Sequence, residues 1–303
     1  MKKDVKIVFM GTPEFAVPAL EKIHSKFGVS LVVTNPDKPS GRGLKPNPSP
    51  VKLKALEQEI PILQPEKIKD PEFYKQIREV APDIIVVVAF KILPPEIFTS
   101  AKIASFNVHP SLLPKYRGPA PLNWQIINGE KETGLTTFIL QEEVDSGNIL
   151  LQYKYEIPDG FTAGDLHDFL APLAGDIAVE TCQLLLSGNY ILQKQDETLA
   201  TKAPKIFPEQ CQIDWKKDCL TIRNFIHGVS PTPGAWTLID GKRFKIYRCV
   251  FQKQAHNNEI GVPIVHKDKL YFPCKDGYII PLEVQMEGKK KMSCEEFCRG
   301  YRF

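Results

Sequence analysis

The sequence lacks any long hydrophobic run. Its longest uninterrupted apolar stretch, residues 84–90, is far shorter than the roughly 18 residues that a membrane-spanning helix needs, so we expect no membrane segment. The first residues lack the apolar core and small-residue cleavage site of a secretory signal. The seven cysteines follow no regular spacing, and Cys294 and Cys298 have no second Cys or His pair to complete a zinc set. We therefore expect free thiols, no metal and a cytoplasmic location.

A large excess of one charge is also absent. Lys and Arg total 39 against 36 Asp and Glu, a net charge of +3. The distribution is uneven, because residues 208–303 hold 16 basic and 11 acidic side chains, whereas residues 1–207 hold 23 and 25. Apolar residues make up 43 % and charged residues 25 % of the 303, as in ordinary globular proteins, and this length favours two domains.

Apolar runs and helical patterns alternate along the first two thirds of the chain. Continuous apolar strands that alternate with amphipathic helices indicate a mostly parallel sheet with helices on both faces, an α/β fold. Two further strands and a long helix end this domain. The strands are expected at 5–10, 29–34, 61–63, 83–90, 103–108, 134–140 and 148–155, and the helices at 14–24, 50–58, 71–80, 121–128 and 163–186.

Residues 197–210 carry two prolines and no periodicity, which is typical of an interdomain linker. After one helix at 219–227, short β-type runs separated by turn signals predict a small β-barrel. We therefore expect domains at 1–207 and 208–303. Basic barrels of this size often bind nucleic acid. The barrel strands are expected at 235–239, 244–250, 269–273 and 278–284.

The glycine pattern of a dinucleotide-binding loop is missing. The first strand ends at Gly11, the only glycine before the next helix, so G-x-G-x-x-G spacing is absent and an NAD-dependent dehydrogenase is disfavoured. The turn at 11–13 could hold an anion at a helix N-terminus, but a structural tight turn is the favoured interpretation.

Asn107 and His109 lie two residues apart at the end of a predicted strand and so project from the same face. In open α/β sheets, ligands bind outside the carboxyl ends of the strands. An amide and an imidazole there suit oxyanion stabilisation and proton transfer, although by itself such a pattern is more commonly a satisfied polar pair at a strand end. Asp145, in a loop between two later strands, joins them only if the fold brings it close.

Residues 35–54 form a basic segment with five Lys or Arg, one Asp, five prolines and two glycines. This composition opposes helix or central strand, so we expect a long exposed loop. The loop is either a solvated surface feature or a contact for nucleic-acid phosphates.

Together these pieces resemble the methionyl-tRNA formyltransferases, a family of folate-dependent formyltransferases. The resemblance covers nearly the whole chain and is most specific at 107–118, where Asn-Val-His-Pro is followed by Ser-Leu-Leu-Pro-Lys-Tyr-Arg-Gly. The other matching segments are 9–16, 36–43, 48–52, Pro121, Gly129, 132–134, 145–147 and 213–215.

The resemblance implies a Rossmann-like domain that binds the co-substrate 10-formyltetrahydrofolate, followed by an OB-like domain that helps hold initiator Met-tRNA. No metal is required, and we expect a monomer without membrane attachment. Asn107, His109 and Asp145 match the catalytic residues of the family. The folate-contacting run corresponds to Ser111, Leu112, Leu113 and Pro114, and the tRNA-contacting basic residues to Arg42, Lys38 and Lys45.

One departure and three alternatives stand beside this resemblance. Phe90-Lys91 occupies a place where many members have Tyr-Gly, near the expected pterin pocket. A formyltransferase acting on an amino sugar nucleotide would share the catalytic residues but would not need the basic segment. Glycinamide ribonucleotide formyltransferase needs only about the first 200 residues. An inactive RNA-binding relative would have no reason to keep the three catalytic residues.

Overall fold

The computed structural model describes residues 5–40 and 45–301, and at 38–40, 45 and 46 the backbone alone. The chain forms two compact units. The first comprises residues 1–118, 134–155 and 167–202, and the second comprises residues 119–133, 156–166 and 203–303. Two short stretches of the first two thirds of the chain, 119–133 and 156–166, therefore belong to the same unit as the C-terminal third.

The first unit is built on a seven-stranded sheet in the order β5-β2-β1-β6-β7-β8-β9. The first five of these strands pair in parallel, and β8 runs antiparallel to β7. The mostly parallel α/β sheet predicted from the sequence is thereby confirmed. The strands are β1 (Ile7–Gly11), β2 (Leu31–Val33), β5 (Ile62–Leu63), β6 (Ile84–Val88), β7 (Ala104–His109), β8 (Glu132–Ile139) and β9 (Ile149–Glu156).

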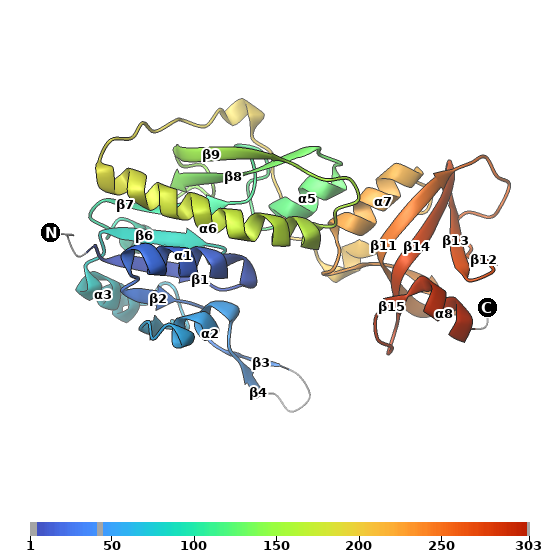
Figure 1. Ribbon diagram of the computed structural model, residues 1–303, viewed down its shortest axis with the longest axis horizontal. Helices are drawn as coiled ribbons and strands as arrows, with labels where there is room; N and C mark the ends of the chain where they lie inside the picture. The colour runs from blue at the N-terminus through green and yellow to red at the C-terminus, as the bar shows by residue number, and fades with distance from the viewer. Residues whose placement is uncertain (1–4, 41–44, 302–303) are drawn as a thin grey trace. The chain divides into compact units, whose positions relative to one another are not determined.

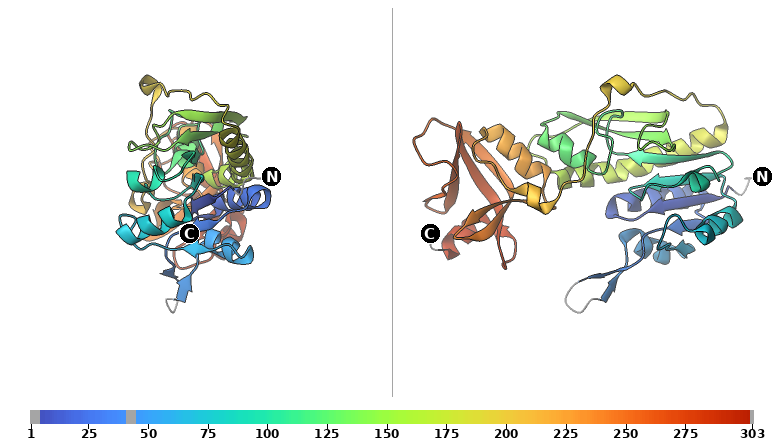
Figure 2. Two further views of the ribbon diagram at one scale, coloured as in Figure 1. Left: turned by 90° about the vertical axis from the view of Figure 1, so that its left-hand side faces the viewer. Right: turned by 180° about the vertical axis from the view of Figure 1, so that it is seen from behind.

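Helices cover both faces of this sheet, which is why β1 and β6 are buried along their whole length. Figure 2 (left) shows the sheet between α1 and α6 on one side and the cyan helices of residues 71–98 on the other. Val8 and Met10 of β1 pack against Phe73 and Ile77 of α3. The helices are α1 (Val17–Phe27), α2 (Pro50–Glu57), α3 (Pro71–Val80), α4 (Pro95–Phe98) and α6 (Ala163–Ser187), with 3-10 turns at Glu14–Ala16 and Glu197–Leu199.

By length and composition, α6 is the one helix among the described residues that could cross a membrane, and half of that stretch is buried inside the protein. Its Thr181 hydroxyl donates a hydrogen bond to Thr137 of β8 at 2.9 Å. At Gly175 a Cβ atom would lie 2.8 Å from the carbonyl oxygen of Pro18 in α1. A core helix of a soluble protein passes the same test, so this feature alone places no segment in a membrane.

The basic segment contains secondary structure that the sequence did not predict. Strands β3 (Lys38–Ser40) and β4 (Lys45–Asn47) form a separate antiparallel hairpin, which Figure 1 shows projecting beyond the sheet. Pro39 lies opposite Pro46 in the register. Proline is tolerated there because both strands of a two-stranded ladder are edges, where a missing N–H costs least. The expectation of one long loop over 35–54 was therefore wrong, since the hairpin interrupts it and residues 50–54 belong to α2, although neither hairpin strand is a central one.

The second unit contains an antiparallel sheet in the order β10-β11-β14-β13-β12, with β15 paired to β14. This confirms the separate β domain. Its core includes Trp215, which stacks on Phe272 with ring centroids 4.5 Å apart. The elements are α5 (Pro121–Ile127), a 3-10 turn at Pro208–Cys211, α7 (Cys219–Gly228), β10 (Ala235–Ile239), β11 (Lys242–Lys253), β12 (Ile264–His266), β13 (Lys269–Cys274), β14 (Gly277–Met286), β15 (Met292–Ser293) and α8 (Cys294–Gly300).

Local capping explains where α7 and α8 begin. The Asp218 carboxylate accepts the backbone N–H of Thr221 in the first turn of α7. At α8 the Ser293 hydroxyl and the Glu296 carboxylate accept each other's backbone N–H groups, a capping box. The short elements α8, β12 and β15 were not predicted from the sequence.

Candidate active site

The carboxyl edge of the parallel sheet carries the predicted catalytic strand. β7 ends at His109 beside the end of β6, with Val108 opposite Val88, and Gly11 at the end of β1 is also opposite Val88. From β1 the chain continues outward to β2 and β5, and it returns to place β6 and β7 on the other side. This reversal of strand order marks the edge where ligands of open α/β sheets bind.

His109 is buried, with 5 % of its surface exposed, and its ring is fixed from one side. Its Nε2 atom lies 2.9 Å from the carbonyl oxygen of Tyr116. A carbonyl only accepts, so Nε2 carries the proton, and Nδ1 is left to face the site. Nδ1 lies 3.8 Å from Oδ2 of Asp145, which is too long for a direct hydrogen bond. The fold thus brings together two of the three predicted catalytic residues.

Asp145 lies in the loop between β8 and β9 and has a left-handed backbone, with φ of 55°. Its Oδ2 atom accepts the backbone N–H of Gly118 at 2.8 Å, which ties this loop to the end of the 107–118 motif. The nearby Gly147 is required sterically, because a Cβ atom would lie 1.7 Å from the carbonyl oxygen of Ile139. The carboxylate is therefore held in place by backbone geometry.

Asn107 occupies the middle of β7, opposite Phe138 of β8. Its side chain is half-buried and forms no hydrogen bond within the described part of the chain. Strand alternation places it on the same face as His109. Its amide is therefore free to bind a ligand beside the imidazole.

The predicted folate run begins directly after β7 and is anchored to β8 and β9. The Thr136 hydroxyl donates to the carbonyl of Ser111 at 2.7 Å, and the Gln152 amide donates to the carbonyl of Leu113 at 2.9 Å. Ser111 and Leu113 are buried, whereas Leu112 and Pro114 are partly exposed. Only the side chains of Leu112 and Pro114 are therefore accessible to a ligand. The buried Ser111 and Leu113 shape the loop.

Residues 195–201, which overlap the start of the predicted linker at 197–210, supply further contacts to this site. Gln195 is 4 % exposed, and its amide nitrogen donates to the carbonyls of Asp145 (2.9 Å) and Gly147 (2.8 Å). The Thr201 hydroxyl accepts the backbone N–H of Tyr116 at 2.8 Å. We call residues 195–201 the strap, because it holds both the Asp145 loop and the carbonyl that fixes His109.

Arg117 completes the strap by an ion pair. Its guanidinium donates to Gln195 at 2.7 Å and to both carboxylate oxygens of Glu197, at 2.7 and 2.8 Å. The hydrogen bond from Arg117 lowers the pKa of Glu197 below its usual value. No sequence signal revealed the strap, since its contacts are mostly to backbone atoms and follow no spacing.

The Phe90-Lys91 departure lies beyond the end of β6, at the same sheet edge as His109. Ala89 before it has a left-handed backbone, with φ of 48°. Phe90 then packs partly on the core beside α3 and α4, and Lys91 is exposed. The lysine therefore adds a cation to the surface near this edge.

The side chains of the three predicted tRNA-contacting residues lie outside the described part of the structure. Arg42 lies outside the described residues, and of Lys38 and Lys45 the backbone alone is described, in β3 and β4. Two other cations of the segment are already paired. Lys52 contacts Asp37 at 2.6 Å, and Lys54 contacts Glu21 at 2.8 Å and Glu57 at 2.7 Å.

Known proteins resemble this chain along nearly its whole length. Family models match it in two places, formyl transferase at residues 5–181 and formyl transferase C-terminal domain at residues 205–302. The methionyl-tRNA formyltransferase of Caldanaerobacter subterraneus subsp. tengcongensis is 45 % identical over 300 residues, 98 % of this chain and 97 % of that protein. That of Geobacter sulfurreducens is 43 % identical over 304 residues, 98 % and 94 % of the two chains.

Solved structures share the fold. An N-formyltransferase from Helicobacter canadensis, in complex with folinic acid and dTDP-3-aminofucose, superposes with a TM-score of 0.70 at 23 % identity, covering 93 % of this chain and 99 % of that one. The methionyl-tRNA formyltransferase of Clostridium thermocellum gives 0.58 at 20 % identity, covering 82 % and 94 %. Since the two family models span most of the chain and its relatives match it end to end, this protein belongs to the formyl transferase family, among the methionyl-tRNA formyltransferases.

Proposed function

We propose that this protein transfers a formyl group from 10-formyltetrahydrofolate to the α-amine of initiator methionyl-tRNA. The product is N-formylmethionyl-tRNA, made in the cytoplasm for translation initiation. The end-to-end likeness to methionyl-tRNA formyltransferases carries this conclusion. The pair of His109 and Asp145 at the carboxyl edge of the sheet supplies groups that suit the chemistry.

The reaction is a transfer between two nitrogens. The neutral amine of the methionyl ester attacks the formyl carbon, a new C–N bond forms, and the carbonyl oxygen becomes an oxyanion. The bond from that carbon to N10 then breaks, and the proton lost by the amine goes to N10. Asn107 donates to the oxyanion through its free side-chain amide, and a donor of this kind contributes about 2.7–4 kcal/mol at the transition state.

His109 has one nitrogen available for this chemistry. Nε2 is bound to the Tyr116 carbonyl, so a proton enters or leaves the ring at Nδ1, which faces Asp145. The Asp145 carboxylate orients the ring from this side, and Nδ1, when it carries a proton, donates a hydrogen bond to the oxyanion. Asp145 also accepts the amine proton, directly or through a water molecule bound to its carboxylate.

We assign the two substrates to different parts of the chain. Residues 1–207 bind the folate, with Leu112 and Pro114 as the accessible side chains of the 111–114 run, and residues 208–303 contribute to tRNA binding. Lys289 and Lys290 are exposed there, whereas Lys291 is paired with Glu283 at 2.8 Å. Replacing Lys289 and Lys290 by Ala therefore weakens tRNA binding, with folate affinity unchanged.

A formylation assay with two acceptors tests this function. The full chain is incubated with 10-formyltetrahydrofolate and either charged initiator tRNA or an amino sugar nucleotide, and the N-formyl product is quantified. We expect product from the tRNA alone. Formylation of the sugar nucleotide with none of the tRNA would replace our assignment, and no product from either would favour an inactive relative.

A further inference from the structure

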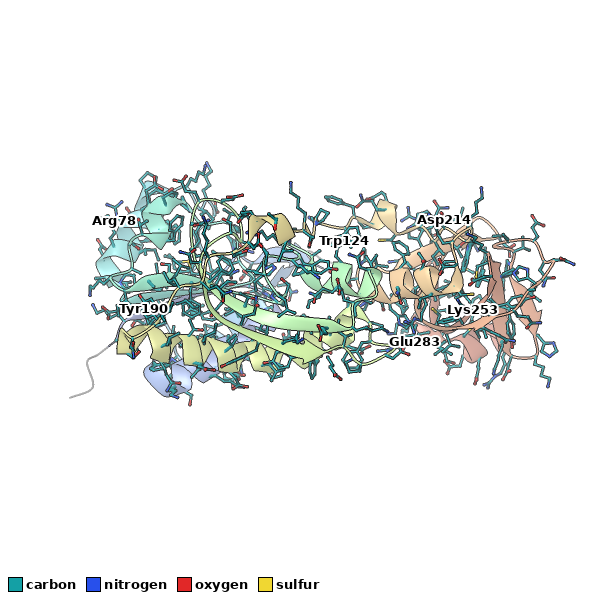
Figure 3. All side chains as sticks on the ribbon, turned by 90° about the horizontal axis from the view of Figure 1, so that it is seen from above. Arg78, Trp124, Tyr190, Asp214, Lys253 and Glu283 are labelled. Atoms are coloured by element: carbon teal, nitrogen blue, oxygen red, sulfur yellow. The ribbon has the colours of Figure 1, made fainter. Side chains whose placement is uncertain are left out.

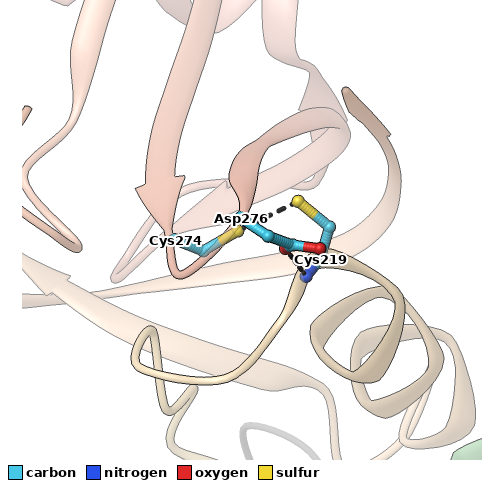
Figure 4. Close-up of side chains that lie close together, drawn as sticks. All are labelled: Cys219, Cys274 and Asp276. Atoms are coloured by element: carbon cyan, nitrogen blue, oxygen red, sulfur yellow. Dashed lines mark hydrogen bonds between the residues drawn. The ribbon is translucent and has the colours of Figure 1, made fainter. Parts of the chain in front are cut away.

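A second cluster of reactive side chains lies in the C-terminal unit, on residues that the formyl transfer does not use. Cys219, Cys274 and Asp276 come from two chain segments and converge beside the start of α7 (Figure 4). We propose that these three residues bind one thiophilic divalent cation of the Zn²⁺ type.

The geometry suits a single ion. One potential ligand atom from each residue lies within 4.8 Å of the others, and the two Sγ atoms are 3.1 Å apart. Zinc bonds are about 2.3 Å to sulfur and 2.0–2.2 Å to oxygen, so two thiolates on one tetrahedral ion are about 3.8 Å apart. The sulfurs therefore need to separate by less than 1 Å.

The ligand types select the ion. Two thiolates and one carboxylate favour Zn²⁺ over Mg²⁺ or Ca²⁺, which prefer oxygen. Binding displaces the two thiol protons, and three anionic ligands around a dication leave one negative charge. Lys253, labelled in Figure 3, balances that charge, with Nζ 3.4 Å from Oδ2 of Asp276. A water molecule completes the fourth position.

The surrounding backbone holds the ligands in place. Asp276 Oδ1 accepts the N–H of Cys219 at 2.7 Å, which joins the carboxylate to the first residue of α7. His256 Nε2 lies 2.8 Å from the carbonyl of Cys274 and 3.1 Å from that of Gly277, so it braces the β13–β14 turn. Partners of this kind orient metal ligands.

The cluster also has a route to solvent. Both cysteines are fully buried, but the Asp276 side chain is 33 % exposed and forms the outer wall. The ion would link the start of α7 to the turn after β13 and so stabilise this unit. Cys294 and Cys298, one turn apart on α8, belong to no three-ligand group in the part of the chain that the structure describes, and they serve as a control.

Zinc titration of the reduced, chelator-treated full chain tests the proposal. We expect the protein to bind one equivalent of Zn²⁺ in competition with a chromophoric chelator. We expect bound Co²⁺ to give a thiolate charge-transfer band. Cys219→Ser and Cys274→Ser each lower the affinity about 100-fold, whereas Cys294→Ser leaves it unchanged. At 100 times Kd, zinc raises Tm by ~5 °C in the wild type.

Asp276→Asn is the second variant, because it keeps the oxygen that accepts the Cys219 N–H and removes only the charge. We expect it to fold and to bind zinc about tenfold more weakly. If either serine variant fails to fold, this variant and the Co²⁺ spectrum decide. Absence of stoichiometric zinc in the reduced protein, or equal zinc binding by the wild type and the folded cysteine variants, would overturn the proposal.

Discussion

Two regions of the α/β unit, to which we assign parts of the same reaction, are built differently. Around His109, hydrogen bonds fix each part of the site. The Tyr116 carbonyl accepts from the His109 ring, the Gly118 N–H donates to Asp145, and the strap binds both the Asp145 loop and the Tyr116 backbone. In the basic segment 35–54, the ion pairs lie at the base of the hairpin, where Lys52 contacts Asp37. Pairing among the hairpin strands is limited to three residues on each side.

The difference separates chemistry from binding. A reacting centre must be held within a fraction of an ångström, and a shift of 1 Å costs about 10²-fold in rate. A segment that binds a phosphate backbone gains from adaptability and affects affinity more than turnover. We therefore expect variants around His109 to lower kcat and variants of the basic segment to raise KM for tRNA.

The largest effect is expected at the three proposed catalytic residues. Asn107→Ala, His109→Ala and Asp145→Ala should each lower kcat by about 10²-fold or more, because these groups act in the transition state. Turnover and tRNA affinity of each variant give the measurement. The losses should not multiply in the double variants. Near wild-type turnover in any single variant would remove that residue from the mechanism.

Arg42→Ala is expected to have the second largest effect on activity. A guanidinium can bind a phosphate or a base edge in a bidentate manner. Its loss should lower kcat/KM for Met-tRNA by a factor that corresponds to roughly 1–3 kcal/mol of binding free energy, and should weaken the salt dependence of kcat/KM. Arg42→Lys should recover part of this. The assay is formylation at two salt concentrations, with folate affinity as the control. Equal efficiency of variant and wild type at both salts would argue for a small acceptor.

Thr201→Val tests the strap with little change in shape. The Tyr116 N–H loses its acceptor, so the carbonyl that fixes His109 becomes less well positioned and kcat should fall about tenfold. Thr201→Ser keeps the hydroxyl and should restore turnover. Thr201 is exposed, so both variants should fold. If Val and Ser behave alike, or if KM alone changes, the Thr201 hydroxyl does not position the site.

The smallest effect is expected from Asp37→Asn, at the base of the hairpin. Its hydrogen bond from Lys52 holds the pKa of Asp37 below the usual value, so the ion pair is lost only as the pH falls through that lowered pKa. Loss of the pair should raise KM for tRNA about threefold, with kcat unchanged. The ratio of the KM for tRNA of Asp37→Asn to that of the wild type should be constant above about pH 5. A ratio that varies across neutral pH would show that another group controls the hairpin.

Part of the site could be predicted because it depends on local rules. Strand alternation placed Asn107 and His109 on one face, and the apolar run before them placed that strand inside the sheet. The 3.8 Å approach of Asp145 to His109 could not be derived from spacing, because it depends on the Gly118 N–H and on a left-handed backbone at Asp145. The resemblance supplied that residue instead.

The rest was hidden for different physical reasons. Gln195 and Thr201 act on backbone atoms of distant loops, and such contacts leave no periodic signal in the sequence. The β3–β4 hairpin was not predicted because proline usually excludes a segment from a β-strand. This rule is weaker for edge strands. By contrast, the capping box at Ser293 and Glu296 was readable and could have revealed α8.

The most direct test of this separation between chemistry and binding is a single-turnover measurement on Thr201→Val and Arg42→Ala. Each variant is saturated with 10-formyltetrahydrofolate and with charged initiator tRNA, and the rate of the first formylation is followed. We predict that Arg42→Ala regains the wild-type rate at saturation, whereas Thr201→Val remains about tenfold slow. A normal rate for Thr201→Val together with a slow rate for Arg42→Ala would contradict it.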